Sequence, residues 1–261
     1  MPFTLAHPAA VLPLRRVRPM STIPLIIGAM TPDVPYYFPW RIAKHIPEAT
    51  HTFLGTFTLD LPIGLGLLIF LWLLRVPLVA PLGAGAQARC LAALERFGSR
   101  WRNWLLAPLS ILVGAWTHLA WDSFTHADSW VVSRVSALSA PVSFFSYTGP
   151  LCHVLQYASS VFGLVVLAIW FARLPVPAQQ PRNEERSAGG PLLLAVLCGA
   201  AVLAGGLEAI ARILRDDPAR YLIFYLLATR TVAWFALLYT IAGIVIVRGR
   251  RRATGTSVTQ T

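Results

Sequence analysis

The 261-residue chain contains little charge. Only 13% of its residues are Asp, Glu, Lys or Arg, whereas 56% are hydrophobic. Soluble domains carry roughly 25% charged residues, so this chain is too poor in charge to cover a water-soluble fold. The composition therefore predicts an integral membrane protein.

Cysteine and acidic residues are also scarce. The three cysteines, Cys90, Cys152 and Cys198, lack the paired spacing that metal sites and disulfides use.

The chain has 22 basic and 11 acidic residues, which gives a net charge of +11. Most arginines lie between the long apolar runs, where they act as orientation signals. We therefore expect a membrane-lipid partner and no nucleic acid.

Four or five apolar runs are long enough to cross a hydrocarbon layer, which takes about 20 helical residues; the run at 105–124 is the weakest candidate because its last turn is polar. They predict an all-α fold, a polytopic transmembrane helix bundle of about five spans. We expect one integral membrane domain at 1–248, with the bundle at 59–248, and a disordered basic-polar tail at 249–261. The predicted spans are 59–80, 105–124, 154–174, 191–214 and 228–247.

Residues 1–58 differ from the bundle because their two apolar stretches, 3–14 and 21–30, are too short to span. We expect a pair of short interfacial or re-entrant helices there, folded over one end of the bundle.

Basic residues indicate an orientation in a bacterial cytoplasmic (inner) membrane. Arginines flank three of the predicted loops and tails, whereas 125–153 contains only Arg134. The positive-inside rule therefore puts 125–153 on the extracytoplasmic side. A basic cluster at Arg15, Arg16 and Arg18 opposes this orientation, unless the N-terminal part dips back or binds anionic head groups.

The stretch THLAWDSFTH, residues 117–126, places ionisable side chains at intervals of four. On a helix, His118, Asp122 and His126 form one slightly slanting stripe. His118 and Asp122 can share a metal ion, whereas His118 and His126 are about 12 Å apart along the axis. Asp122 could bridge two ions with its two oxygens.

Six such residues are expected at the same end of the bundle. Ionisable groups at membrane depth are functional candidates, although hydrogen bonding or ion pairing among them is the competing explanation. Imidazole and carboxylate together suit Zn²⁺, Mn²⁺ or Fe²⁺ better than Mg²⁺ or Ca²⁺. The predicted metal ligands are His7, Asp33, His51, His118, Asp122 and His126.

Two carboxylates are candidate catalytic residues. A divalent ion lowers the pKa of bound water, and Asp33 or an uncoordinated Asp60 could orient that water. Asp60 lies nine residues after His51, on the opposite face if one helix is continuous. A role as a buried hydrogen-bond partner is therefore an equal alternative for Asp60.

Several segments resemble the bacterial membrane family DUF4184. They are MPFTLAHPAAVLPLRR, MTPDVPYY, HTFLGTFTLDLPIG, GAWTHLAWDSFTH and LQYASSVFGL, which together cover most of residues 1–170. The resemblance implies an integral membrane architecture more than an activity.

The order of the candidate ligands is also distantly similar to that in zinc-dependent phospholipase C and related nucleases. That similarity implies one ion at Asp33, His51, His118 and Asp122, and another at His7 and Asp122. The soluble enzymes use an N-terminal tryptophan, where this chain has Met1, and need further ligands downstream. Because only His126 and His153 remain for that role, a one- or two-metal site is expected.

These patterns favour a membrane-embedded metal-dependent hydrolase acting on a lipid or lipid-linked phosphoester, with zinc as the expected cofactor. One alternative is a non-enzymatic membrane protein with a structural metal site or a buried polar cluster. A transporter is a second alternative, but it would place polar groups near the bilayer midplane. Here they gather at one end.

Overall fold

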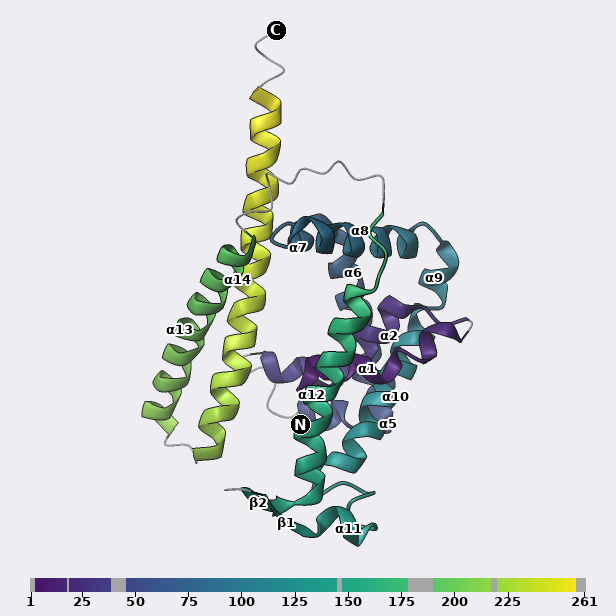
Figure 1. Ribbon diagram of the computed structural model, residues 1–261, viewed down its shortest axis with the longest axis vertical. Coiled ribbons are helices and arrows are strands. Elements are labelled where there is room, and N and C mark those ends of the chain that lie inside the picture. Colours follow the sequence, from purple (N-terminus) through teal and green to yellow (C-terminus); the bar gives the residue numbers. More distant parts are fainter. Residues whose placement is uncertain are drawn as a thin grey trace. The chain divides into compact units, whose positions relative to one another are not determined.

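Long helices dominate the structure, which is a computed structural model (Figure 1). It describes residues 3–17, 19–38, 46–144, 147–177, 190–216 and 220–256. The all-α prediction is confirmed. The longest helices are α10 (Ala107–Thr125), α12 (Leu151–Ala172), α13 (Gly190–Asp216) and α14 (Arg220–Thr256).

Four helical stretches are long and apolar enough to cross a membrane. Three of them match the predicted spans at 154–174, 191–214 and 228–247, and the fourth matches the predicted first span in part. The stretches are Phe53–Leu73, Leu151–Ala172, Gly190–Ala211 and Leu226–Arg252.

The first span begins and ends earlier than the predicted 59–80. It consists of α5 (Phe53–Gly55), the π-helical turn η4 (Thr56–Asp60) and α6 (Leu61–Leu73). The helix stops because Pro77 has no N–H and its ring would clash with the carbonyl four residues earlier. A separate helix, α7 (Arg75–Val79), follows.

The predicted span at 105–124 is a helix, α10, but it is not among the four stretches that are apolar enough to span. Pro108 lies in its first turn, where a missing N–H is tolerated. The extended backbone of His126 ends it, with φ −105° and ψ 130°. That α10 crosses the membrane therefore stays a prediction.

The described part of residues 1–58 forms several short helical elements rather than the two predicted helices, because prolines interrupt this part of the chain repeatedly. Leu25 and Ala29 are fully buried, so this part contributes to the protein core. Its elements are η1 (Thr4–Ala6), α1 (Pro8–Val11), η2 (Leu14–Arg16), α2 (Thr22–Gly28), η3 (Thr31–Tyr37) and α4 (Ile46–Thr50).

The chain divides into two compact units. Unit 1 comprises 1–35, 40–69 and 97–174, and unit 2 comprises the remainder. In unit 1, α2 packs on α10, and η1 and α1 pack on α12. Gly163 of α12 permits this approach, since a Cβ there would lie 2.9 Å from the carbonyl oxygen of Ala6. Unit 1 also contains α9 (Trp101–Leu105).

The segment between α10 and α12 contains a β-hairpin that the sequence analysis does not predict. Strands β1 (Pro141–Phe144) and β2 (Tyr147–Pro150) pair antiparallel, after the short helix α11 (Ser136–Ser139). Each strand has only four residues, too few for an alternating hydrophobic pattern to stand out.

Unit 2 contains α7, α8 (Ala84–Gly98), α13 and α14. Arg230 of α14 donates hydrogen bonds to the carbonyls of Tyr36 and Phe38 and lies 3.9 Å from the Glu208 carboxylate. Helix α14 continues to Thr256, so residues 249–256, expected to be a disordered tail, are helical. Residues 249–256 contain no proline, so nothing forces the helix to stop earlier.

Candidate metal centre

Helix α10 positions His118 and Asp122 one turn apart on a face buried in unit 1. Two glycines bring α2 close to this face. A Cβ on Gly114 would lie 2.7 Å from the backbone nitrogen of Ala29, and a Cβ on Gly28 would overlap the backbone of Ile111. The close approach places the end of α2 directly beside His118.

The backbone of Ala29 fixes the orientation of His118. The Nδ1 atom lies 2.9 Å from the carbonyl oxygen of Ala29, and a carbonyl can only accept a hydrogen bond. Nδ1 therefore carries a proton, and a metal ion would bind the other ring nitrogen, Nε2. Nε2 lies 3.2 Å from Asp122 Oδ2.

The N-terminal part adds Asp33 from η3 and His51 from the turn after α4. His51 Nε2 lies 3.4 Å from Asp33 Oδ1 and 3.7 Å from Asp122 Oδ2. His118 Nε2 lies 3.6 Å from Asp33 Oδ1. In a tetrahedral site with bonds of about 2.0–2.1 Å, neighbouring ligand atoms are about 3.3 Å apart. These four separations are close to that value, and within the described residues Asp33, His51 and His118 form one group that could hold an ion.

Hydrogen bonds behind these atoms hold their side chains in place. Nδ1 of His51 donates to the carbonyl of Pro47 at 2.7 Å, and the hydroxyl of Thr4 donates to Asp33 Oδ2 at 2.7 Å. Such outer partners set the tautomer and the direction of metal ligands.

The inward-facing atoms themselves have no hydrogen-bond partner, although all are buried. Unpaired buried polar atoms are rare and costly in folded proteins, and an unplaced ion is one explanation for them. Among the described residues, these atoms are Asp33 Oδ1, His118 Nε2 and both carboxylate oxygens of Asp122.

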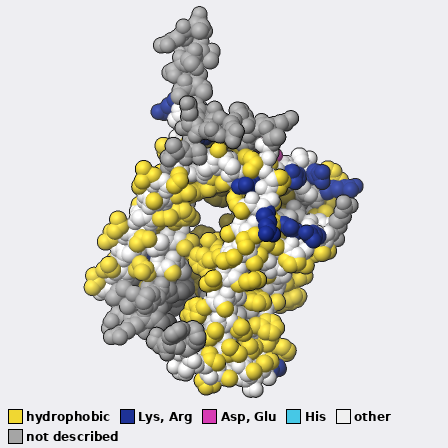
Figure 2. Space-filling model, viewed as in Figure 1, with side chains coloured by type: hydrophobic (Ala, Val, Ile, Leu, Met, Phe, Trp, Pro, Cys, Tyr) yellow, Lys and Arg dark blue, Asp and Glu magenta, His cyan; other side chains and the backbone are white. Residues whose placement is uncertain are grey.

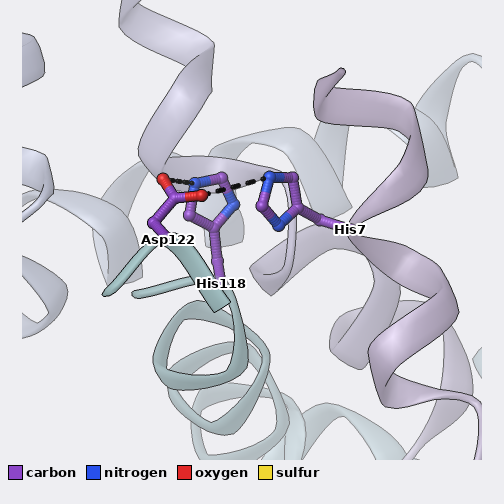
Figure 3. A group of neighbouring side chains, drawn as sticks. All are labelled: His7, His118 and Asp122. Carbon is purple, nitrogen blue, oxygen red and sulfur yellow. Dashed lines mark ion pairs between the residues drawn. The ribbon is translucent and has the colours of Figure 1, made fainter. Parts of the chain in front are cut away.

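His7 forms a second group with His118 and Asp122 (Figure 3). It lies between η1 and α1, its ring stacks on that of His118, and its Nε2 lies 3.7 Å from Asp122 Oδ1. Burial and the neighbouring His118 lower the pKa of His7 to about 4. The imidazole is therefore neutral at physiological pH, as a metal ligand must be.

The carboxylates of the cluster face histidines. Among the described residues, the ion-pair partners of Asp33 and Asp122 are all histidines, and neither carboxylate meets a Lys or Arg. Burial alone would raise the pKa of Asp33, but the neighbouring His118 and His51 side chains hold it below its ordinary value. A divalent ion would balance two buried carboxylates.

His126 lies at the edge of the cluster. Its Nδ1 donates to the backbone carbonyl of Asp122 at 3.0 Å and lies 3.8 Å from Asp122 Oδ1. A protonated Nδ1 has no lone pair to offer, so coordination would require Nε2. The role of His126 as a ligand therefore stays a prediction.

Asp60 also belongs to this region. It is fully buried, neither carboxylate oxygen has a hydrogen-bond partner among the described residues, and it interacts electrostatically with His51, His118 and Asp33. His51 precedes the helix that contains Asp60, and the π-helical turn Thr56–Asp60 changes the helical phase. Because no single regular α-helix runs from His51 to Asp60, the condition that would put Asp60 on the opposite face is not met. Single π-helical turns occur frequently at functional sites.

An apolar pocket of about 160 Å³ in unit 1 reaches His7. Its walls come from η1, α1, the last turns of α10 and the middle of α12. The lining residues include Ala6, Ala10, Trp121, Phe162 and Gly163. His7 therefore lies both in the polar cluster and in the wall of an apolar cavity.

The buried His and Asp groups can thus hold a metal ion. Within the described part of the chain, two groups have ligand atoms within 4.8 Å of one another: His7, His118 and Asp122, and Asp33, His51 and His118. The sequence analysis does not identify Thr4 or the carbonyls of Ala29 and Pro47 as supporting partners. Backbone carbonyls leave no signal in a sequence, and Thr4 is marked only by its proximity to His7.

Comparison with known proteins gives one result. The model of the family described as "Domain of unknown function (DUF4184)" matches residues 1–247, so the chain belongs to that family. No curated protein and no solved structure matches the chain. The similarity to zinc-dependent phospholipase C is not shown by these comparisons.

Proposed function

We propose that this member of DUF4184 is a membrane-embedded, metal-dependent hydrolase that acts on a lipid or lipid-linked phosphoester. The observation that carries the proposal is the cluster of buried ligand atoms from Asp33, His51, His118 and Asp122, with four separations of 3.2–3.7 Å.

The ligand chemistry favours zinc. Two imidazole nitrogens and two carboxylate oxygens form a mixed set that Zn²⁺ accepts readily, with Mn²⁺ or Fe²⁺ as the next candidates. Ca²⁺ and Mg²⁺ prefer oxygen alone.

A second metal position would use the other oxygen of Asp122. Asp122 Oδ1 is directed to His7 Nε2 at 3.7 Å, while Oδ2 belongs to the first group. With only two or three protein ligands, this position would keep room for water or substrate. A bound divalent ion would supply activated water and polarise the phosphoester oxygen.

A side chain of the protein would then accept the proton that the attacking water releases. Asp60 is close enough to interact electrostatically with His51 and His118, yet neither of its oxygens has a hydrogen-bond partner in the described part of the chain. It is therefore available to accept a proton from the attacking water. Asp33, whose Oδ2 is held by Thr4, is fixed as a ligand and would orient that water only through Oδ1.

The apolar pocket beside His7 supports a lipid substrate. A soluble phosphoester would gain nothing from a cavity lined by Ala6, Phe162 and Gly163, whereas a hydrocarbon segment would fill it. Phe162 is 69% exposed on a helix apolar enough to span the membrane, so lipid reaches this face directly.

The proposed location follows the basic residues. Arg96, Arg100 and Arg102 precede α10, and the metal-binding end of α10 is its other end. By the positive-inside rule the site would be extracytoplasmic in a bacterial inner membrane.

A structural metal site is the second candidate. The four-ligand group favours it, because closed tetrahedral shells are typical of structural zinc. The open second position at His7 and Asp122 and the adjoining pocket favour the hydrolase.

An activity screen separates the two. The purified full-length protein, loaded with zinc, manganese or iron, would be given phosphatidylglycerol vesicles and bis-p-nitrophenyl phosphate in parallel. We expect phosphoester cleavage that is lost with a chelator and in His118→Ala. A protein that binds metal tightly but cleaves neither phosphoester would overturn the hydrolase proposal and support the structural site.

A further inference from the structure

A second pocket of unit 1 is basic. It has a volume of about 340 Å³ and lies where η2 meets the C-terminal end of α12. Arg15 enters from η2, while Trp170 and Arg173 come from the end of α12. Val166, Ile169 and Leu174 complete the wall. Two arginines more than 150 positions apart in sequence therefore line one cavity.

Neither arginine is neutralised within the described part of the chain. No described carboxylate lies within ion-pair distance of Arg15 or Arg173, and the guanidinium of Arg15 is placed over the ring of Trp170, 5.6 Å from its centroid. A cavity with two uncompensated positive charges would attract an anion.

Trp170 adds a hydrogen-bond donor to the same wall. Its indole Nε1 is buried and has no acceptor within the described segments of the chain. A buried indole N–H normally finds a partner, so this atom indicates an acceptor supplied by a ligand.

The pocket lies where a spanning helix ends. The candidate span closes at Ala172, one residue before Arg173. Figure 2 shows dark blue Lys and Arg side chains gathered around this end of α12, while yellow hydrophobic side chains cover the rest of the helix. A ligand here would meet water at one side and hydrocarbon at the other.

We propose that this pocket binds the phosphate of an anionic phospholipid. Arg15 and Arg173 would hold the phosphate, and the Trp170 N–H would donate to one of its oxygens. The first acyl carbons would lie along Val166 and Ile169. Val166 also lines the pocket beside His7, so one apolar face of α12 continues from this pocket towards that one.

The two arginines favour an anionic phospholipid over a neutral lipid. The apolar wall of the pocket favours a phospholipid over free phosphate. The proposal does not depend on the metal centre, because no candidate metal ligand lines this pocket.

Native mass spectrometry of the full-length protein in detergent tests the proposal. The probes are phosphatidylglycerol, phosphatidylcholine and inorganic phosphate. We expect phosphatidylglycerol to bind the wild type more tightly than phosphatidylcholine. A basic side chain near the membrane surface contributes roughly a fivefold preference for an anionic lipid, so Arg15→Gln with Arg173→Gln should weaken phosphatidylglycerol binding roughly 30-fold.

Two further variants make the result specific. Trp170→Phe keeps the ring but removes the N–H, and we expect a smaller loss of phosphatidylglycerol binding. The matched control is Arg134→Gln, because Arg134 also lies over a tryptophan ring, Trp130, at 4.2 Å but lines neither pocket. It should bind the lipid as the wild type does.

Three results would overturn the proposal. They are wild-type binding by the double variant, equal binding of phosphatidylcholine and phosphatidylglycerol to the wild type, and displacement of the lipid by millimolar inorganic phosphate. The last would identify a site for free phosphate.

Discussion

Replacing Gly114 by alanine should weaken metal binding, although Gly114 is not a ligand. The added Cβ would lie 2.7 Å from the backbone nitrogen of Ala29 and 2.9 Å from the carbonyl carbon of Gly28. Carbon contacts are most favourable at about 3.5–4.0 Å, so α2 must move away from α10 by roughly 1 Å. All of the closest atoms belong to the backbone, so no side-chain rotation can relieve the overlap.

That movement acts on the metal centre through Ala29. Its carbonyl accepts the hydrogen bond from His118 Nδ1 at 2.9 Å, and a displacement of roughly 1 Å would break this bond. Loss of an outer partner of a metal-binding histidine typically lowers metal affinity 10- to 100-fold, and overpacking costs about 1–3 kcal/mol of stability.

Competition against a fluorescent zinc chelator would measure the affinity, and thermal unfolding in detergent would measure the stability. The matched control is Gly66→Ala, because a Cβ on Gly66 meets nothing within 4 Å. If Gly114→Ala binds zinc as tightly as Gly66→Ala and unfolds at the same temperature, the link from helix packing to the metal centre is refuted.

Three other changes test separate parts of the site. Thr4→Val removes the hydroxyl that holds Asp33 Oδ2, so zinc affinity in the chelator assay should fall roughly tenfold; an unchanged affinity would exclude that role. Asp60→Asn should keep the metal, measured by elemental analysis, but lose phosphoester cleavage, whereas loss of metal would make Asp60 a ligand. The pKa of His7 is about 4 in the folded protein and 6.5 as a free side chain. Between these two pH values His7 is protonated in the unfolded state and neutral in the folded state. The metal-free protein should therefore lose about 3 kcal/mol of stability as pH falls from 6.5 to 4, and His7→Gln should show a smaller loss in denaturant titrations.

The sequence predicted the parts of the site that depend on helical periodicity. His118 and Asp122 are four residues apart, and a helix brings them together wherever it lies. The expectation that residues 1–58 bring His7, Asp33 and His51 to this pair rested on their placement at one end of the bundle. The structure brings all five residues together.

The remaining features depend on tertiary packing, which periodicity does not encode. The side of the helix on which Asp60 lies depends on a π-helical turn, and such a turn has no sequence signature of its own. The carbonyl of Ala29 reaches His118 only because Gly28 and Gly114 allow two backbones to meet. The first span ends early because Pro77 disrupts the preceding helical turn. The apolar pattern continues through this turn and therefore gives no sign of the break.

Metal content tests the central claim most directly. Wild-type protein, Asp122→Ala and His118→Ala would be purified in detergent with Asp128→Ala, an exposed aspartate near the same helix end, as the matched control. Elemental mass spectrometry should find stoichiometric zinc, manganese or iron in the wild type and in Asp128→Ala, and none in the other two folded variants. Wild-type protein that is free of metal and takes up no added ion would contradict the metal centre and leave a buried polar cluster in its place.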